Sequence, residues 1–200
     1  MIEMAQFDDW VDGINTYIAS QAGSAANVPR VIIVHAIRSA VKQFLTRSKV
    51  WVYKPHTTIN NMDDRLLMIP RDTFICKLWQ IRECGHLTDY MTYSFPNIVH
   101  LGKLSKHDRE SEHLKNIEVS LSVTQTSLEC PMFVFDRYYD GILSGALASL
   151  QAMPGKAWAE PSMVAYHRDI YESAITSAMS DVSAGLNRQK PANSIPANFI

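Results

Sequence analysis

The side chains best suited to metal binding or acid–base chemistry gather in one charged stretch, Lys103–Lys115. This stretch holds two histidines among three acidic residues: His107, His113, Asp108, Glu110 and Glu112. Imidazole and carboxylate groups are common zinc ligands, but their spacing here fits no closed zinc pattern. Because clusters of charged residues usually lie on the surface, we interpret the stretch as a solvated loop or tip.

The patterns of known catalytic sites are not found in the sequence. Ser144-Gly145 falls within a predicted helix, whereas a nucleophile elbow needs a strand–turn–helix setting. His35 lies beside Arg38 on another predicted helix, where a satisfied or exposed histidine is the expected state. A Ser-His-Asp triad remains possible on composition alone. No phosphate-binding loop or dinucleotide fingerprint is present, so we expect no enzymatic activity, no cofactor and no metal site.

Length and composition are those of a folded protein. The chain has 200 residues, of which 46% are hydrophobic and 20% are charged, enough to form one domain with a substantial core. The formal net charge of -1 disfavours binding to nucleic acid through bulk charge. No signal peptide and no apolar run of about 18 residues is seen, which predicts a soluble protein with no membrane span.

The three cysteines are Cys76, Cys84 and Cys130. They are odd in number and lack metal-ligand spacing, which favours free thiols in a reducing compartment. A disulfide between Cys76 and Cys84 is the alternative.

Helical periodicity marks both ends of the chain. Apolar residues recur at helical spacing over 7–18 and 33–44, and again over 135–150 and 163–182. Proline precedes or opens three of these stretches, at Pro29, Pro131 and Pro161. Met153-Pro154-Gly155 ends the third helix and predicts an antiparallel partner after it. The predicted core is Trp10, Ile14, Ile37, Phe44, Phe135, Leu143, Leu147, Tyr166 and Ile170.

The middle of the chain shows β signals. Short apolar runs are separated by turn residues, and Ile117–Thr124 alternates strictly between apolar and polar side chains. Such alternation predicts an antiparallel sheet with one buried face and one wet face. The fold class is therefore α+β. Residues 1–49 and 128–186 build one bundle of about four helices, residues 50–127 are a β insertion, and residues 187–200 are an extended C-terminal arm.

Two glycines within the third helix predict a close helix contact. Gly141 and Gly145 are four residues apart, so they form a small-residue strip on which another helix can approach. Each costs about 1 kcal/mol relative to alanine in a helix, which implies a packing role. The partner is either another helix of the same subunit or a neighbouring subunit.

Two groups of residues are candidates for partner binding. Arg38 and Lys42, with Arg47 and Lys49, form a potential basic side on the second helix. They are interpreted as a solvated face, or in a ring as residues that pair with a neighbour or line a DNA channel. In the C-terminal arm, Ile195, Phe199 and Ile200 are apolar residues unexpected in a solvated end. We interpret these three as anchors for a groove on a neighbour, or otherwise as part of a frayed terminus.

The third and fourth helices resemble those of a known family. Residues Pro131–Tyr166, with Gly145-Ala146-Leu147, Pro154-Gly155-Lys156 and Trp158, are similar to head-to-tail adaptor proteins of short-tailed bacteriophages. Val28–Trp51 fits the same family more weakly. Glu160 stands where that family more often has Asp or Asn, which predicts a weaker helix cap.

The resemblance implies a structural virion protein, made in the host cytoplasm and located at the head–tail junction. Such adaptors form a homo-oligomeric ring of twelve subunits under the portal protein and present a platform for tail or nozzle proteins. Double-stranded DNA passes through the ring without sequence readout. The arm, with Ile195, Phe199 and Ile200, would reach the portal or a neighbouring subunit. The alternative is a sequence-independent DNA-binding or packaging accessory protein that uses Arg38, Lys42, Arg47 and the Lys103–Lys115 loop.

Overall fold

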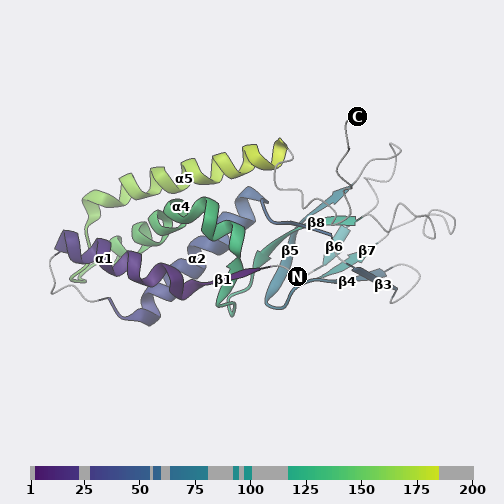
Figure 1. Ribbon diagram of the computed structural model, residues 1–200, viewed down its shortest axis with the longest axis horizontal. Helices are drawn as coiled ribbons and strands as arrows, with labels where there is room; N and C mark the ends of the chain where they lie inside the picture. Colours follow the sequence, from purple (N-terminus) through teal and green to yellow (C-terminus); the bar gives the residue numbers. More distant parts are fainter. Residues whose placement is uncertain are drawn as a thin grey trace, which may run out of the picture.

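The computed structural model describes residues 3–22, 28–54, 56–59, 64–80, 92–94, 97–100 and 117–184. Long helices form one end of the described molecule, and antiparallel strands gather at the other (Figure 1). The α+β class with about four helices, predicted from the sequence, is confirmed. The predicted loop at Lys103–Lys115, the cysteine Cys84 and the predicted arm at residues 187–200 lie outside the described residues.

The helical body consists of one short 3₁₀ helix and four α-helices among the described residues. They are η1 (Phe7–Trp10), α1 (Val11–Ala22), α2 (Arg30–Ser48), α4 (Met132–Gln151) and α5 (Pro161–Ser183). Pro29 and Pro131 are the N-cap residues of α2 and α4, and Pro161 occupies the first turn of α5. The Glu160 side chain, at the N-cap of α5, accepts from the Ser162 hydroxyl but makes no capping hydrogen bond to a backbone N–H, in line with the weaker cap predicted from its type.

The core of the helical body lies where η1, α1, α2 and α4 meet. Trp10, Ile14, Ile37, Phe44 and Leu147 are all buried, as predicted. The predicted core residues Phe135 and Leu143 are only partly buried and pack at its edge, and Ile170 is also only partly buried.

Tyr166 is wrongly predicted as a core residue. Its side chain is 56% exposed, and α5 instead buries His167, Tyr171, Ile175 and Ala178. The sequence placed Tyr166 and Ile170 in the core, whereas the structure buries the residues that follow them, His167 and Tyr171. A histidine on an apolar face can be buried if its polar atoms find partners. Here His167 Nε2 lies 2.9 Å from the hydroxyl of Tyr17 on α1.

Helices α4 and α5 are antiparallel neighbours joined by a short loop, as predicted. Gly155 in this loop has a φ of +71°, a conformation that glycine adopts at little cost. Gly141 and Gly145 both face α5, and we call their contact with Ala174 and Tyr171 the glycine seam. A Cβ atom at Gly141 would lie 2.4 Å from the Cβ of Ala174, so the two helices meet where no side chain fits. The strip therefore packs inside one subunit.

Three antiparallel sheets are formed by the described strands. A two-stranded sheet pairs β1 (Met4–Gln6) with β9 (Glu129–Pro131). The second sheet has the order β2 (Val52–Tyr53), β8 (Ile117–Val123) and β5 (Thr73–Gln80). The third has the order β3 (His56–Ile59), β4 (Asp64–Met68), β7 (Ile98–His100) and β6 (Thr92–Ser94).

The polar face of β8 is buried, so the prediction of a wet face is wrong. Ser120 and Ser122 have no exposed surface. Their hydroxyl groups donate to backbone carbonyls of α2, that of Lys49 at 2.8 Å and that of Lys42 at 3.1 Å. Serine is small and can satisfy its own hydrogen bonds, so the alternating pattern is compatible with a helix packed on its polar side. We call this contact between β8 and the second half of α2 the serine seam.

Candidate interaction surface on helix α2

An open groove follows the first turns of α2 on the surface of the helical body. Its volume is about 960 Å³, and the rim and walls come from η1, α2, the segment before β9 and the end of α4. Val31 and Leu128 are 78% and 57% exposed, and they belong to the few large apolar side chains of the described residues that face solvent. The residues that line this α2 groove are Asp8, Arg30, Val31, Ile32, Val34, His35, Arg38, Leu128 and Met153.

Two arginines give the α2 groove its charge. Arg30 at the start of α2 forms an ion pair with Asp8 of η1. Arg38 donates from Nε to the carbonyl oxygen of Ser127 at 2.7 Å, which holds its guanidinium beside Leu128. Arg30 and Arg47 form ion pairs with Asp8 and Glu172. Arg38 forms no ion pair with any of the described residues. The terminal nitrogens of Arg38 are therefore available to an anionic group in the groove.

The predicted basic side of the second helix is not one surface. Lys42 lies with its Nζ 5.8 Å from the centre of the Phe74 ring on β5. Lys49 is the C-cap of α2 in a left-handed conformation, and its Nζ donates to the carbonyl of Thr46. Arg38 therefore faces the α2 groove, whereas Lys42 lies over β5 and the Lys49 ammonium is bonded to its own helix.

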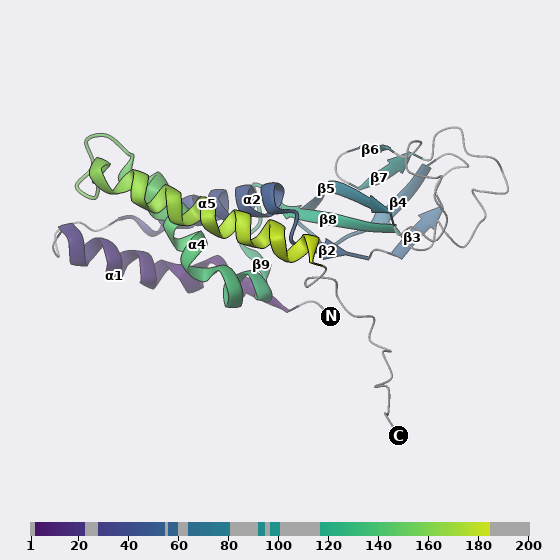
Figure 2. The same cartoon turned by 90° about the horizontal axis from the view of Figure 1, so that it is seen from above.

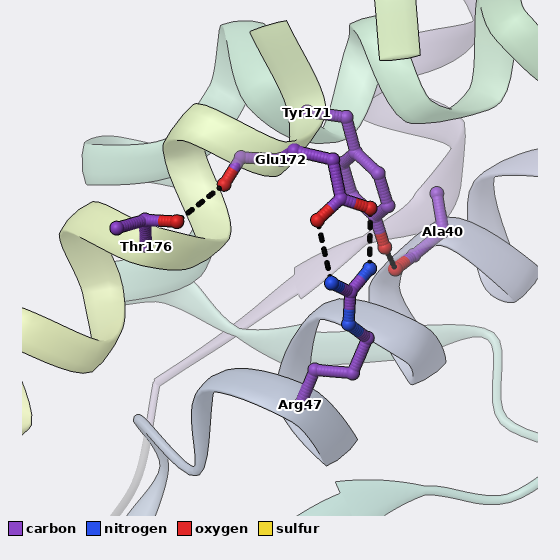
Figure 3. Close-up of polar contacts among 5 residues, drawn as sticks. All are labelled: Ala40, Arg47, Tyr171, Glu172 and Thr176. Atoms are coloured by element: carbon purple, nitrogen blue, oxygen red, sulfur yellow. Dashed lines mark hydrogen bonds and ion pairs between the residues drawn. The ribbon is translucent and has the colours of Figure 1, made fainter. Parts of the chain in front are cut away.

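Arg47 faces α5 instead. Both of its terminal nitrogens bind the carboxylate of Glu172 at 2.5 Å (Figure 3). Each group favours the charged form of the other, so the hydrogen bond raises the pKa of Arg47 and lowers that of Glu172. The residue before Glu172, Tyr171, donates from its hydroxyl to the carbonyl of Ala40 on α2 at 2.6 Å. These contacts tie α5 to α2, which gives Arg47 a role inside the subunit.

The residues expected to bind a partner are thus divided by the structure. Arg38 lies in the α2 groove, and Lys42 lies at the contact with β5. Ile195, Phe199 and Ile200 lie outside the described residues, as do His107 and His113. Val31 and Leu128 were missed by the sequence analysis. A signal for Val31 was present, because it is a β-branched apolar residue off the inward stripe of α2.

The two cysteines among the described residues are held as thiols. Burial raises the pKa of the Cys76 thiol to about 11, and its Sγ donates to the carbonyl of Ser120 at 3.3 Å. Burial also raises the pKa of Cys130, so both thiols stay protonated at neutral pH. Within the described ranges, no group of three or more His, Cys, Asp or Glu residues is arranged to hold a metal ion.

Comparisons with known proteins add no relative. No protein-family model matches the chain, and no curated protein is significantly similar to it. None of the helices in the described part of the chain combines the length and apolar character needed to cross a membrane.

Proposed function

We propose that this chain is a structural virion protein whose copies form a ring between the portal of a bacteriophage head and its tail. In this role the ring continues the DNA channel, and double-stranded DNA passes through it without sequence readout. The C-terminal arm, through Ile195, Phe199 and Ile200, reaches the portal or a neighbouring subunit. Tail or nozzle proteins bind the other side of the ring.

The observation that best supports this proposal is the construction of the α4–α5 hairpin. The residues that carry the resemblance to adaptor proteins are those that the hairpin geometry requires. Gly141 and Gly145 permit the close approach of α5, Gly155 adopts a positive φ in the loop, and Pro161 opens α5. The resemblance therefore rests on residues with a shared structural purpose, which is how members of one structural family resemble each other.

The α2 groove also supports an assembly role. An exposed groove that is lined mainly by apolar side chains usually marks a binding site for a protein partner. The residues that line the groove include none from α5 or from the described strands, so those elements remain available for other contacts. Figure 2 shows α5 along the helical body and the strands β2 to β8 beyond its end.

The test is the mass of the particle formed when the protein is mixed with a purified portal ring. Light scattering should show a fixed number of copies, near twelve, added to each portal. Removal of Asn187–Ile200 should abolish this addition and leave the circular dichroism spectrum unchanged, because no described core residue lies beyond Val182. Binding of the isolated chain to DNA, with a steep dependence on salt and no addition to the portal, would support the packaging accessory instead.

A further inference from the structure

The first turns of α2 expose an apolar face to solvent. Four large apolar side chains of the described residues are exposed, and two of them, Val31 and Leu128, line the α2 groove. Val31, His35 and Arg38 follow one another at positions i, i+4 and i+7, so they share one side of the helix. Exposed apolar side chains gathered in one groove are costly in water and indicate a partner.

The end of the groove at the start of α2 is acidic. Asp8 forms an ion pair with Arg30, and both residues also line a second hollow of about 720 Å³. Asp12 lines that hollow as well, and it forms no ion pair with any of the described residues. Two carboxylates therefore lie beside one guanidinium, which leaves this end of the groove with an excess of negative charge.

The other end of the groove is basic. Arg38 follows Arg30 by eight residues, which corresponds to about 12 Å along the helix axis. Its Nε is bonded to the Ser127 carbonyl, and its terminal nitrogens have no carboxylate partner among the described residues. Such a guanidinium can bind a carboxylate through two parallel hydrogen bonds. The groove thus carries opposite charges at its two ends, with apolar walls between them.

This distribution of charge makes the groove complementary to itself. A twofold contact brings the same patch of two copies together, so the patch must match its own rotated image. When two α2 helices pack antiparallel about an axis near Val34, the Arg30 end of each helix faces the Arg38 end of the other. Arg38 of each copy then meets the acidic end that contains Asp12 of the other copy. Opposite charges at both ends fix the register of such a contact.

We infer that the free chain forms a twofold dimer through the α2 groove, with the apolar walls of the two copies in contact and Arg38 of each copy paired with Asp12 of the other. The two grooves fill each other, so the contact closes at two copies and does not propagate. Copies in a ring repeat a head-to-tail contact instead, so the dimer goes beyond the proposed function and does not rest on it. Another protein partner can bind the groove only after the dimer separates.

The experiment is a charge-reversal cycle on the full chain, measured by sedimentation velocity. Arg38→Glu places carboxylates opposite each other at both ends of the contact, and Asp12→Arg places guanidiniums opposite each other. We expect the wild-type chain to show a monomer–dimer equilibrium and each variant alone to raise the dissociation constant by about tenfold or more. An equal mixture of the two variants restores both pairs of opposite charges, so we expect a heterodimer almost as tight as the wild-type dimer.

Two exposed residues of α5 provide matched controls. Arg168→Glu makes the same charge reversal outside the groove. Met179→Asp, at a side chain that is 50% exposed, matches Val31→Asp within the groove. We expect both α5 variants to dimerise like the wild type and Val31→Asp to remain monomeric. Val31→Asp dimers as tight as those of the wild type would show that the apolar face is not in contact.

Three further results would overturn the dimer. The first is a wild-type chain that stays monomeric up to its limit of solubility. The second is a mixture of Arg38→Glu and Asp12→Arg that associates no more tightly than either variant alone. The third is a wild-type species that grows beyond two copies with concentration, because it would indicate an open contact. None of these measurements uses a portal or DNA, so failure of the dimer is distinguishable from failure of the proposed ring.

Discussion

Two contacts hold helices in place with small residues, but they do so by different means. In the glycine seam, Gly141 and Gly145 of α4 leave room for Ala174 and Tyr171 of α5, and the contact depends on shape alone. In the serine seam, Ser120 and Ser122 of β8 donate to carbonyls of α2. The first contact fails when an atom is added, and the second fails when an oxygen atom is removed.

The difference reflects what each partner presents. At Gly141 and Gly145, helix α4 offers α5 a surface without side chains, so close packing stabilises the seam itself. Elsewhere along the two helices, the Tyr138 hydroxyl of α4 donates to the carboxylate of Asp181 on α5 at 2.5 Å. At the end of α2, the carbonyl of the C-cap residue has no intrahelical partner, and it needs a donor when it is buried. The carbonyl of Lys49, the C-cap residue, receives its donor from Ser120. Small residues in a sequence therefore predict a close contact but not its chemistry.

The largest effect should come from adding one carbon to the glycine seam. Gly141→Ala places a Cβ 2.4 Å from the Cβ of Ala174, which cannot move without its helix. We expect the free energy of unfolding to fall by about 3 kcal/mol, the upper range for overpacking, despite the better helix propensity of alanine. Urea denaturation measures this change.

Gly13→Ala is the matched control for that variant. A Cβ at Gly13 also meets an atom at 2.4 Å, but this atom is the hydroxyl oxygen at the end of the Tyr139 side chain. The ring can shift, so we expect a change of less than about 1 kcal/mol, within the size of the propensity gain. If Gly141→Ala and Gly13→Ala lower the free energy of unfolding equally, the glycine seam does not depend on the fixed backbone of α5.

The serine seam should be broken by the loss of a hydroxyl. Ser120 donates to the Lys49 carbonyl and accepts from the indole N–H of Trp79, so Ser120→Ala leaves both without that partner in a buried place. We expect a loss of about 2 kcal/mol in the free energy of unfolding. Ser149→Ala is the control, because Ser149 is exposed and binds only a carbonyl of its own helix. A loss no greater than in the control would show that the seam is held by packing.

A smaller effect is expected from pH, at a third contact between helices. His167 of α5 is buried against Tyr17 of α1, and its Nδ1 has no hydrogen-bond partner among the described residues. Burial lowers the pKa of His167, so the folded state binds its proton less readily than the unfolded state. Stability should be full above the unfolded pKa, about 6.5, and should decrease as pH falls below it.

A variant separates the contribution of His167 to the pH dependence of stability from the contributions of other titrating groups. His167→Phe should flatten the dependence of the unfolding free energy on pH between about pH 7 and pH 5. His35→Gln, at an exposed position of α2, should leave the slope of the wild type unchanged. A wild-type slope that persists in His167→Phe would assign the effect to another group.

The smallest effect should come from the exposed clamp between α2 and α5. The side chains of Arg47 and Glu172 are 48% and 44% exposed, so solvent screens their attraction. Glu172→Gln should cost less than about 1 kcal/mol at neutral pH. Because the pKa of Glu172 is lowered in the folded state, its contribution is present above the unfolded pKa and is lost as pH falls through the folded pKa. Thermal unfolding of the wild type and of Glu172→Gln at pH 7 and pH 3 measures this cost and its dependence on pH. A larger cost at pH 3 than at pH 7 would contradict the pairing of Glu172 with Arg47.

The positions of the helices were predicted from the sequence more accurately than the side of each helix that is buried. The starts of α2 and α5 follow from Pro29 and Pro161, because proline is favoured only in the first turn of a helix. Tyr166 was misplaced because periodicity counts residue types, whereas burial of His167 depends on a hydroxyl from α1. The pairing of β1 with β9 was not predicted either, since three-residue strands leave no periodic pattern.

The candidate surface could be predicted only in part. Arg38 was identified by its charge, and it does line the α2 groove. Its grouping with Lys42, Arg47 and Lys49 relied on helix position, but contacts with the sheet and with α5 divide these cations. Leu128 was out of reach, because only the folding of the segment before β9 onto α2 brings it into the groove.

The pairing of β1 with β9 has a consequence for the order of events during synthesis. Gln6 and its partner Glu129 are 123 positions apart, and the whole β region lies between them. A ribosome adding about 5–20 residues per second needs roughly 6 to 25 seconds to cover that interval. During this time α4, the helix that covers Phe7 and Trp10 in the folded protein, has not yet been synthesised. The emerging chain is therefore exposed to chaperones and proteases until α4 has left the ribosomal tunnel.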